Sequence, residues 1–350
     1  MRRRLLCILT LAAILAGCSV GDKPLPREKS DSVDTSSFSE CFNEVASHSA
    51  DELHSLMVLQ DGKVIYEQYG TGHGPDELHV MWSASKTFTA AAVGLAVHDG
   101  LMSVDDKVVD FFDASELPQR PGRWLRELTV KDLLIMSSGL TTSLNDPLHA
   151  GRLDEPIKSI LTSPLSFRPG EKWEYNSTDS YILSAIVTRV TGQKVVDLVA
   201  ERLFKPMGIR RYEWSESTEG YCFGGWGLYL TTESLAKMAQ LLLDGGLWNG
   251  KRLLDAAWVE EMMSPQIMQY AGRLELDPES LRAITSEDDW NLGYGYQMWC
   301  GRNGSARLDG AWGQYAVIVP SRRAVMVATA AASNNKTVLN ALWQYIYPSL

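Results

Sequence analysis

The order of the predicted elements along the chain constrains the fold more than any other feature of the sequence. Two short β-prone runs flank Asp61-Gly62, which is a strong hairpin signal, and further runs of this kind return near the C-terminus. The residues between about 101 and 290 have mostly helical spacing instead. The predicted strands are 55–60, 64–69, 295–300, 315–319 and 324–329.

Strands at both ends of a chain and helices between them predict an α+β fold. In this fold a central antiparallel sheet, built from both chain ends and flanked by helices, carries an inserted, mostly helical domain. The 350 residues, of which 45% are hydrophobic, suffice for a large core. The predicted limits are a signal peptide at 1–17, a lipidated flexible tether at 18–37, an α/β domain from 38–100 with 290–350, and a helical domain at 101–289.

The N-terminal residues are typical of an exported lipoprotein. Arg2-Arg3-Arg4 precede an apolar stretch from Leu5 to Ala16, which is too short to span a bilayer and is typical of a signal peptide. Leu15-Ala16-Gly17-Cys18 resembles the bacterial lipobox, in which the cysteine is lipidated; a plain signal peptide with an incidental cysteine is the alternative. By resemblance to lipoprotein sorting rules, Ser19 favours an outer-membrane anchor facing the periplasm. The polar residues that follow, up to about 37, predict a flexible tether.

Composition narrows the possible partners and cofactors. The formal net charge is −10 and no basic run follows the signal region, so nucleic acid is not an expected partner. The six histidines form no H-E-x-x-H or other tight ligand pair, so we predict no metal and no other cofactor. For Cys222 and Cys300 a disulfide is one alternative, and three buried thiols including Cys41 is the other. The oligomeric state stays open.

The segment from Met81 to Lys86 carries the candidate chemistry. Ser83 and Lys86 are spaced i, i+3 at the start of a predicted helix over 83–97, so their side chains can touch. A lysine can activate a serine only if its pKa falls, and both burial and a helix N-terminus lower it. Backbone N–H groups at the same helix start, including that of Ser83, can hold an oxyanion.

The S-x-x-K spacing occurs twice more in the chain and is therefore weak evidence alone. Ser234 and Lys237 lie in an amphipathic pattern, where we expect a solvated helix face. Ser333 and Lys336 are expected in a loop and helix cap. We favour Ser83 because it opens an apolar helix directly after a hairpin.

The stretch from Ser83 to Thr89 resembles the active-site helix of serine hydrolases related to class C β-lactamases. This superfamily also holds DD-peptidases, SxxK esterases and 6-aminohexanoate-dimer hydrolases. The resemblance covers roughly residues 50 to 345, and it implies a β-lactamase/transpeptidase-like fold and an acyl-enzyme mechanism without a cofactor. Its further landmarks, in family order, are Asp132-Leu133-Leu134 with Met136-Ser137-Ser138-Gly139-Leu140, Pro169-Gly170-Glu171-Lys172-Trp173-Glu174-Tyr175, Gly224-Gly225 with Thr231 to Gly245, and Gly313-Gln314-Tyr315.

The resemblance also implies roles for individual residues. Tyr175 is the third catalytic group, which relays the serine proton, and a nearby lysine ammonium is expected to lower its pKa; a buried aromatic after a Pro-Gly turn is the alternative. Ser177 stands where the family has a substrate-binding asparagine. The family's K-T-G strand aligns with Leu308-Asp309-Gly310, so the backbone N–H of Ala311 becomes the second oxyanion donor, close to Gly313.

Leu308 replaces the lysine that helps the family bind a substrate carboxylate, although Arg302 or Arg307 are candidate substitutes. This weakens the case for anionic β-lactams and D-Ala-D-Ala peptides. We therefore predict a serine hydrolase that cleaves a small ester or amide through an acyl-enzyme on Ser83. A DD-peptidase or β-lactamase and a non-catalytic binding lipoprotein of the envelope stay open as alternatives. Four tryptophans lie beside the landmark motifs; each one alone is expected to be a core residue, and the wall of an acyl pocket is the alternative for Trp82, Trp226, Trp299 and Trp312.

Overall fold

The computed structural model describes residues 22–30, 32–48, 51–269 and 289–350. The predicted signal peptide at 1–17 and the predicted lipidation site Cys18 lie outside these residues. Within the described ranges, no helix is long and apolar enough to cross a membrane.

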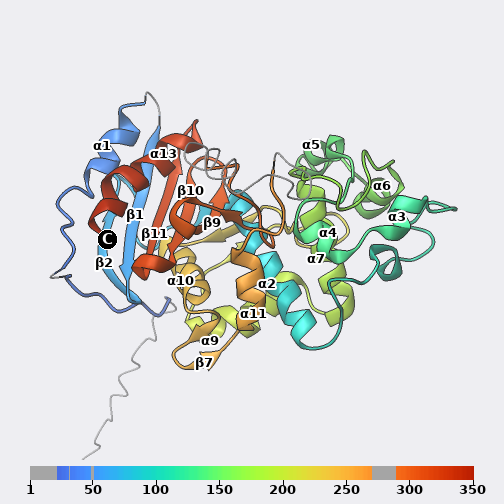
Figure 1. Cartoon of the computed structure of the whole chain (residues 1–350), viewed down its shortest axis with the longest axis horizontal. Helices are drawn as coiled ribbons and strands as arrows, with labels where there is room; N and C mark the ends of the chain where they lie inside the picture. The colour runs from blue at the N-terminus through green and yellow to red at the C-terminus, as the bar shows by residue number, and fades with distance from the viewer. Residues whose placement is uncertain (1–21, 31, 49–50, 270–288) are drawn as a thin grey trace, which may run out of the picture.

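A six-stranded antiparallel sheet is built from both ends of the chain, as the order of the elements predicts (Figure 1). Its strand order is β2-β1-β11-β10-β9-β8, so N-terminal and C-terminal strands meet where β1 pairs with β11. The predicted fold class is therefore confirmed. The strands are β1 (Glu52–Gln60), β2 (Lys63–Tyr69), β8 (Trp299–Cys300), β9 (Ala306–Gly310), β10 (Gln314–Val319) and β11 (Ala324–Ala331).

The first hairpin forms at the predicted turn. Asp61 and Gly62 both have positive φ, 48° and 78°, as a type I′ turn requires, and Asp-Gly is among the pairs that adopt this conformation readily. β1 and β2 pair on either side of this turn, from Gln60 opposite Lys63 outward.

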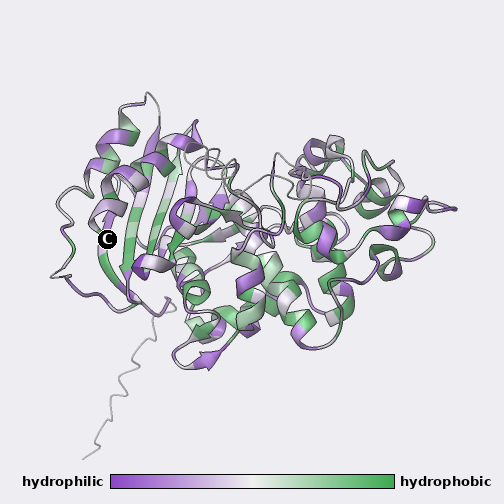
Figure 2. Ribbon diagram, viewed as in Figure 1, coloured by the Kyte–Doolittle hydropathy of each residue, from purple (hydrophilic) through white to green (hydrophobic). Residues whose placement is uncertain are grey.

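Both faces of the sheet are covered, so its central strands are apolar on both sides (Figure 2). Leu56 and Val58 of β1 pack into the cluster that contains α1 (Glu40–Ala46) and α13 (Asn335–Ala341), whereas Met57 and Leu59 pack into the main core. On the main-core side, α10 (Thr232–Leu243) packs against β1, β10 and β11.

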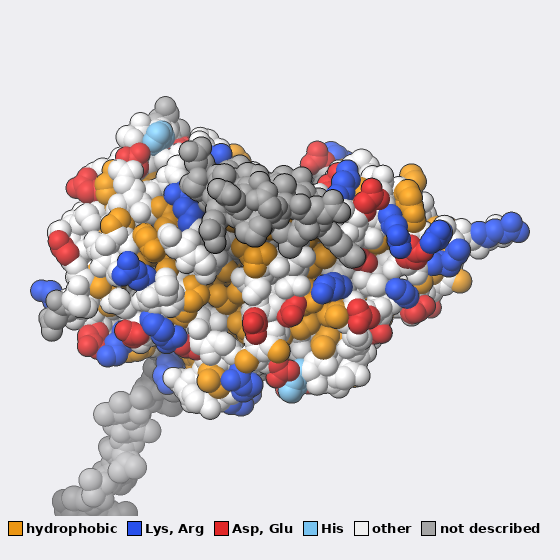
Figure 3. All heavy atoms as spheres, viewed as in Figure 1, with side chains coloured by type: hydrophobic (Ala, Val, Ile, Leu, Met, Phe, Trp, Pro, Cys, Tyr) orange, Lys and Arg blue, Asp and Glu red, His pale blue; other side chains and the backbone are white. Residues whose placement is uncertain are grey.

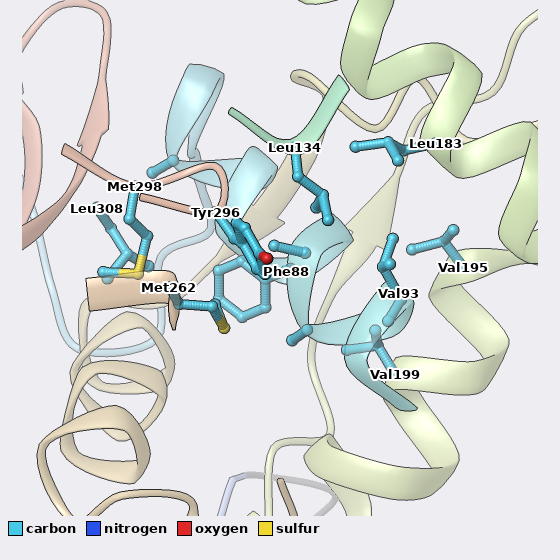
Figure 4. Packing of buried hydrophobic residues seen from close by; sticks show 14 of the residues in the cluster. Phe88, Val93, Leu134, Leu183, Val195, Val199, Met262, Tyr296, Met298 and Leu308 are labelled. Atoms are coloured by element: carbon cyan, nitrogen blue, oxygen red, sulfur yellow. The ribbon is translucent and has the colours of Figure 1, made fainter. Parts of the chain in front are cut away.

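The helix α2 (Ser85–His98) lies between the sheet and the helices of the inserted region (Figure 1). Twelve of its residues are buried, and it contacts α7, α8 and β9. Figure 4 shows Phe88 and Val93 of this helix among side chains from both halves of the molecule, such as Val199 and Leu308. The helix therefore fixes the position of one half relative to the other.

Apart from the 15-residue α7, the remaining elements are short, and most lie in the predicted helical span 101–289, although α10 of this span covers the sheet. On the face seen in Figure 3, acidic and basic side chains are interspersed. The remaining elements are β3 (His79–Val80), η1 (Trp82–Ala84), η2 (Val108–Phe111), α3 (Arg123–Glu127), α4 (Val130–Leu134), η3 (Thr142–Leu144), α5 (Asn145–His149), α6 (Pro156–Thr162), α7 (Ser177–Thr191), α8 (Val195–Val199), η4 (Ala200–Phe204), α9 (Lys205–Met207), β4 (Glu213–Trp214), β5 (Leu228–Leu230), β6 (Leu247–Trp248), β7 (Lys251–Arg252), α11 (Ala256–Met263), η5 (Arg302–Gly304), η6 (Pro320–Arg322), η7 (Leu342–Ile346) and η8 (Tyr347–Ser349).

Residues 22–30, which the sequence places in a flexible tether, lie against the folded body. The chain pairs with the open edge of β2, where the backbone N–H of Glu28 donates to the carbonyl of Val64 at 3.0 Å. Lys237 Nζ donates to the carbonyl of Lys23 at 2.5 Å. Ser234 and Lys237, expected on a solvated face, are consequently buried.

The cysteines of the described ranges form no disulfide. Cys41, Cys222 and Cys300 are free, buried thiols, so the Cys222–Cys300 alternative is wrong. Cys300 belongs to β8 of the large sheet. Cys222 instead forms an isolated antiparallel β-bridge with Glu216, beside the small sheet of β3, β5 and β4. Burial raises the pKa of Cys222 to about 11 and that of Cys300 to about 12, so both thiols are protonated and unreactive at neutral pH.

Candidate active site

Ser83 lies in the short turn η1 between β3 and α2. The chain enters this turn through Trp82, whose φ of 45° is unusual for a non-glycine residue. The backbone N–H of Met81 donates to the carbonyl of Leu228 at 2.7 Å and anchors the turn to β5. Ser83 remains partly exposed, whereas Ala84 to Lys86 are buried. The predicted helix at 83–97 is thus a 3₁₀ turn followed by α2.

Lys86 is almost completely enclosed, with 1% of its surface exposed. Its Nζ contacts three oxygen atoms, namely Ser83 Oγ at 3.2 Å, Ser177 Oγ at 3.1 Å and the carbonyl oxygen of Gly225 at 2.9 Å. The predicted contact between Ser83 and Lys86 is therefore present. Three acceptors match the three protons of an ammonium group, and a neutral amine would accept a proton from Ser83 instead.

Burial lowers the pKa of Lys86 from 10.5 to about 7, because the buried ammonium loses its hydration. The carboxyl groups of Asp179 and Asp309 act in the opposite direction and limit this fall. A substantial share of the Lys86 side chains is consequently neutral near pH 7, which is the form that a general base needs.

Tyr175 lies beside the pair formed by Ser83 and Lys86. Lys86 Nζ is 4.8 Å from the centroid of the tyrosine ring, and Ser83 forms a hydrogen bond with the Tyr175 hydroxyl. Burial nevertheless raises the pKa of Tyr175 above its ordinary value, and the bond to Ser83 offsets only part of this rise. The expectation that a lysine ammonium lowers this pKa is therefore wrong, because burial dominates and leaves a neutral phenol.

The landmark segments 136–140 and 169–175 pack together and hold Tyr175 in place. The backbone N–H of Gly170 donates to the carbonyl of Ser137 at 2.8 Å, and that of Glu174 to the carbonyl of Met136 at 2.8 Å. Gly139 is required between them, since a Cβ atom there would lie 2.2 Å from the carbonyl oxygen of Phe167.

The two residues after Tyr175 have separate tasks. Asn176 is the N-cap of α7, where its side chain accepts from the backbone N–H of Thr178 at 3.1 Å and donates to the carbonyl of Leu140 at 3.0 Å. Ser177 is buried and directs its hydroxyl to Lys86. The serine at the family's asparagine position is thus a direct neighbour of the lysine.

The loop between β9 and β10 lies against the Ser83 turn. Gly310 must lack a Cβ, because that atom would lie 2.3 Å from the carbonyl oxygen of Met81. Trp312 and Gly313 have positive φ, 64° and 88°, and turn the chain so that Gln314 pairs with Gly310. Ala311 is the first residue of this loop, next to the contact with Met81. The loop that carries Ala311 therefore lies beside the Ser83 turn, and the oxyanion role of Ala311 stays a prediction.

Arg302 and Arg307, the two candidate substitutes for the missing lysine, are each already paired with an aspartate. Arg307 is buried and donates from Nε to Asp309 Oδ2 at 2.9 Å, and Arg302 Nε donates to Asp289 Oδ1 at 2.8 Å. Leu308 is buried in the main core (Figure 4). Neither arginine is thus a free cation for a substrate carboxylate.

Two buried polar residues that the motifs did not single out support the site. Asp179 accepts from Ser138 Oγ at 2.7 Å, and burial raises its pKa well above the usual value. Gln297 binds the carbonyls of Leu133 and Leu134 and the hydroxyl of Ser180 through its side chain. The sequence gave little signal for Asp179, because it lies in the polar first turn of α7, where an acidic residue is common. Gln297 gave none, because its partners are distant in sequence.

The four tryptophans have different environments. Trp299 stacks on Tyr175 with ring centroids 5.6 Å apart, and therefore walls the site. Trp226 follows Gly225 and stacks on His149 at 3.6 Å. Trp82 and Trp312, which flank Ser83 and Ala311 in sequence, line a cavity of about 290 Å³. An aromatic wall beside the nucleophile suits an apolar acyl or leaving group.

A serine on a turn before a buried helix, with a lysine of lowered pKa one turn later, is the arrangement typical of SxxK serine hydrolases. The chain belongs to the Beta-lactamase family, whose model matches residues 53–346.

Several known proteins are similar to this chain. The 6-aminohexanoate-dimer hydrolase of Paenarthrobacter ureafaciens is 25% identical over an alignment of 273 positions, and the match covers 73% of this chain and 66% of that protein. The lovastatin esterase of Penicillium rubens is 26% identical, over 55% of this chain and 60% of the esterase. The chain thus spans less than two thirds of the length of these relatives.

Solved structures share the fold. The putative 6-aminohexanoate-dimer hydrolase from Bacillus anthracis superposes with a TM-score of 0.75 at 18% identity, covering 94% of this chain and 88% of that one. A D-stereospecific amidohydrolase from Streptomyces gives a TM-score of 0.64 at 16% identity, over 88% of this chain and 98% of the other. At these identities the likeness shows a common fold.

The lowered pKa of Lys86 predicts a specific dependence of stability on pH. Between pH about 7 and 10, the unfolded chain still binds a proton at Lys86 that the folded chain has released. The free energy of unfolding should therefore rise with pH in this window for the wild type relative to Lys86→Met. Below pH 7 both states are protonated, so the difference should become constant.

Urea unfolding from pH 6 to pH 10 measures this difference. Lys107→Met, which removes an exposed lysine, serves as the control for loss of a surface charge. A difference between wild type and Lys86→Met that is flat, or that falls as the pH rises, would contradict the lowered pKa.

Proposed function

We propose that the protein is a serine hydrolase that cleaves an ester or amide through an acyl-enzyme on Ser83. The observation that carries the proposal is the 3.2 Å contact between Ser83 Oγ and the enclosed amine of Lys86. Burial lowers the pKa of that amine to about 7, and this proximity makes it the base for the serine hydroxyl.

In the first step, the neutral amine of Lys86 takes the proton of Ser83 as Oγ bonds to the substrate carbonyl carbon. The carbonyl oxygen becomes an oxyanion, for which the backbone N–H groups of Ser83 and Ala311 are the proposed donors. When the carbonyl re-forms, the bond to the leaving group breaks, and that group takes a proton from the Tyr175 hydroxyl. The proton on Lys86 then passes to Tyr175. Water attacks the acyl-enzyme by the same route in reverse and restores Ser83.

Tyr175 acts in this scheme as a neutral phenol that passes protons on. Its raised pKa makes a standing tyrosinate unfavourable, whereas the hydrogen bond to Ser83 and the nearby Lys86 provide a path for a proton. Ser177 and the carbonyl of Gly225 orient the amine of Lys86 toward Ser83.

The surroundings of the site favour a substrate without a carboxylate next to the scissile bond. Leu308 stands in place of a lysine, and Arg302 and Arg307 are each held by an aspartate. Trp299 supplies an apolar wall instead. Similarity to a 6-aminohexanoate-dimer hydrolase and to a lovastatin esterase supports an ester or amide as the substrate.

We further propose that the enzyme is anchored in the cell envelope by lipid on Cys18, on the periplasmic side of an outer membrane. The support is the lipobox-like sequence before Cys18. Residues 22–30 follow the open edge of β2, so an anchor at Cys18 would hold the catalytic body close to the bilayer.

Ser83→Ala should abolish covalent labelling by a fluorophosphonate or an activated ester, because Ser83 is the partly exposed hydroxyl of the site, whereas the Ser177 hydroxyl beside Lys86 is buried. Intact-protein mass spectrometry measures the adduct, and peptide mapping locates it. The matched control is Ser234→Ala, which alters the other buried S-x-x-K pair and should leave labelling intact. Equal labelling of wild type and Ser83→Ala would refute the proposed nucleophile.

Cys18→Ser should release the protein from the membrane fraction when the full-length gene is expressed in a Gram-negative host. Metabolic labelling with palmitate, followed by separation of inner and outer membranes, measures attachment. Cys41→Ser provides the control, because Cys41 is a buried thiol of the folded body. Palmitate incorporation that persists in Cys18→Ser would contradict the anchor.

A further inference from the structure

Three histidines and two glutamates gather at the end of the sheet where β1 begins and β2 ends. Glu52 and His54 belong to the start of β1, His73 and Glu77 to the segment that follows β2, and His79 to β3. We call these five residues the histidine cluster. None of them takes part in the hydrolytic mechanism proposed above.

Glu52, His54 and His73 each offer one ligand atom, and these atoms all lie within 4.8 Å of one another. His73 Nε2 and Glu52 Oε1 are 3.2 Å apart. Two ligands of a tetrahedral zinc ion, with bonds of about 2.1 Å, stand about 3.4 Å from each other. This pair therefore already has the separation of neighbouring zinc ligands.

A second carboxylate orients His73. Its Nδ1 lies 2.8 Å from Glu77 Oε2, so that Nε2 faces the other members of the cluster. Histidines that bind metals are commonly held in this way, with one ring nitrogen on a carboxylate and the other on the ion. The ring of His54 stacks on that of His73 with centroids 4.0 Å apart, so the two imidazoles are direct neighbours.

Two ring nitrogens of the cluster lack a hydrogen bond, and one of them, His79 Nε2, lies 3.9 Å from Glu77 Oε2. Among the described residues, His54 Nδ1 and His79 Nε2 are buried atoms that make no hydrogen bond. His79 as a whole is only 7% exposed. Buried polar atoms without partners are rare and ask for an explanation such as an absent ion.

The backbone places His54 in this position through an irregularity of the sheet. The register between β1 and β11 shifts between Leu53 and Ser55, which is a β-bulge at His54. Bulges redirect side chains and are frequent at functional sites. The backbone N–H of Gly70 donates to the carbonyl of His54 at 2.8 Å, and the N–H of His73 to the carbonyl of Gly70 at 3.1 Å, so one turn fixes both histidines.

We propose that Glu52, His54 and His73 bind a divalent transition-metal ion of the zinc type, and that Glu77 is a positioning residue for His73. A set of two imidazoles and a carboxylate suits zinc and disfavours calcium or magnesium. The ion neutralises charge among the glutamates and links the start of β1 to the segment that leads through β3 to Ser83. Its role is to fix the entry to the nucleophile turn.

The test is a calorimetric titration of the chelator-treated protein with Zn²⁺. Absorption spectra of the same protein with Co²⁺ complete the test. We expect one ion per chain, a Tm that rises with Zn²⁺ concentration, and the visible bands of tetrahedral Co²⁺. The double variant His54→Gln/His73→Gln should lose binding, and Glu77→Gln should weaken it about 10–100-fold. His98→Gln, which removes an exposed histidine paired with Asp255, is the matched control and should bind like the wild type.

Glu52→Gln, a change at an exposed position, replaces the double variant if the latter fails to fold. Three results would overturn the metal site. One is binding at less than one ion per chain, and another is binding that survives in Glu52→Gln and the double variant. The third is a loss of binding in His98→Gln as large as that in the double variant. Ser83→Ala should lose fluorophosphonate labelling but bind Zn²⁺ like the wild type, so a failure of the hydrolase mechanism and a failure of the metal site are distinguishable.

Discussion

The enclosure of the Lys86 amine is the constraint on which the rest of the site depends. A charged ammonium without water is unfavourable, and the protein offsets this cost with three oxygen contacts and two distant carboxyl groups. The balance leaves the pKa near 7, where the group can both take and return a proton. A fully hydrated lysine would remain charged and could not activate Ser83.

That enclosure is a product of the whole fold. α2 carries Lys86 between the sheet and the inserted helices, α7 supplies Ser177, and the segment before β5 supplies the carbonyl of Gly225. The long-range pairing of β1 with β11 brings the loop of Ala311 from the other end of the chain to the Ser83 turn. Nucleophile, base and loop therefore come from segments that only the finished sheet holds together.

The sequence predicted the elements whose signals are local. Asp61-Gly62 gave the hairpin, apolar spacing gave α2, and the i, i+3 spacing gave the contact of Ser83 with Lys86. Features that depend on distant partners were missed or wrong. The pKa of Tyr175 is set by burial, the course of residues 22–30 by the open edge of β2, and the histidine cluster by a bulge and a turn. Glu52 and His54 are close in sequence, but the third proposed ligand, His73, follows β2 and joins them only in the folded chain.

The dependence of the acylation rate on pH tests the central claim most directly. Single-turnover acylation by an activated ester should speed up as the pH rises through an apparent pKa near 7, because deprotonation produces the neutral amine of Lys86. Lys86→Met should lose this rise and react about 10²–10⁴-fold more slowly. A wild-type rate without a transition near pH 7, or an acylation rate that survives in Lys86→Met, would contradict the account.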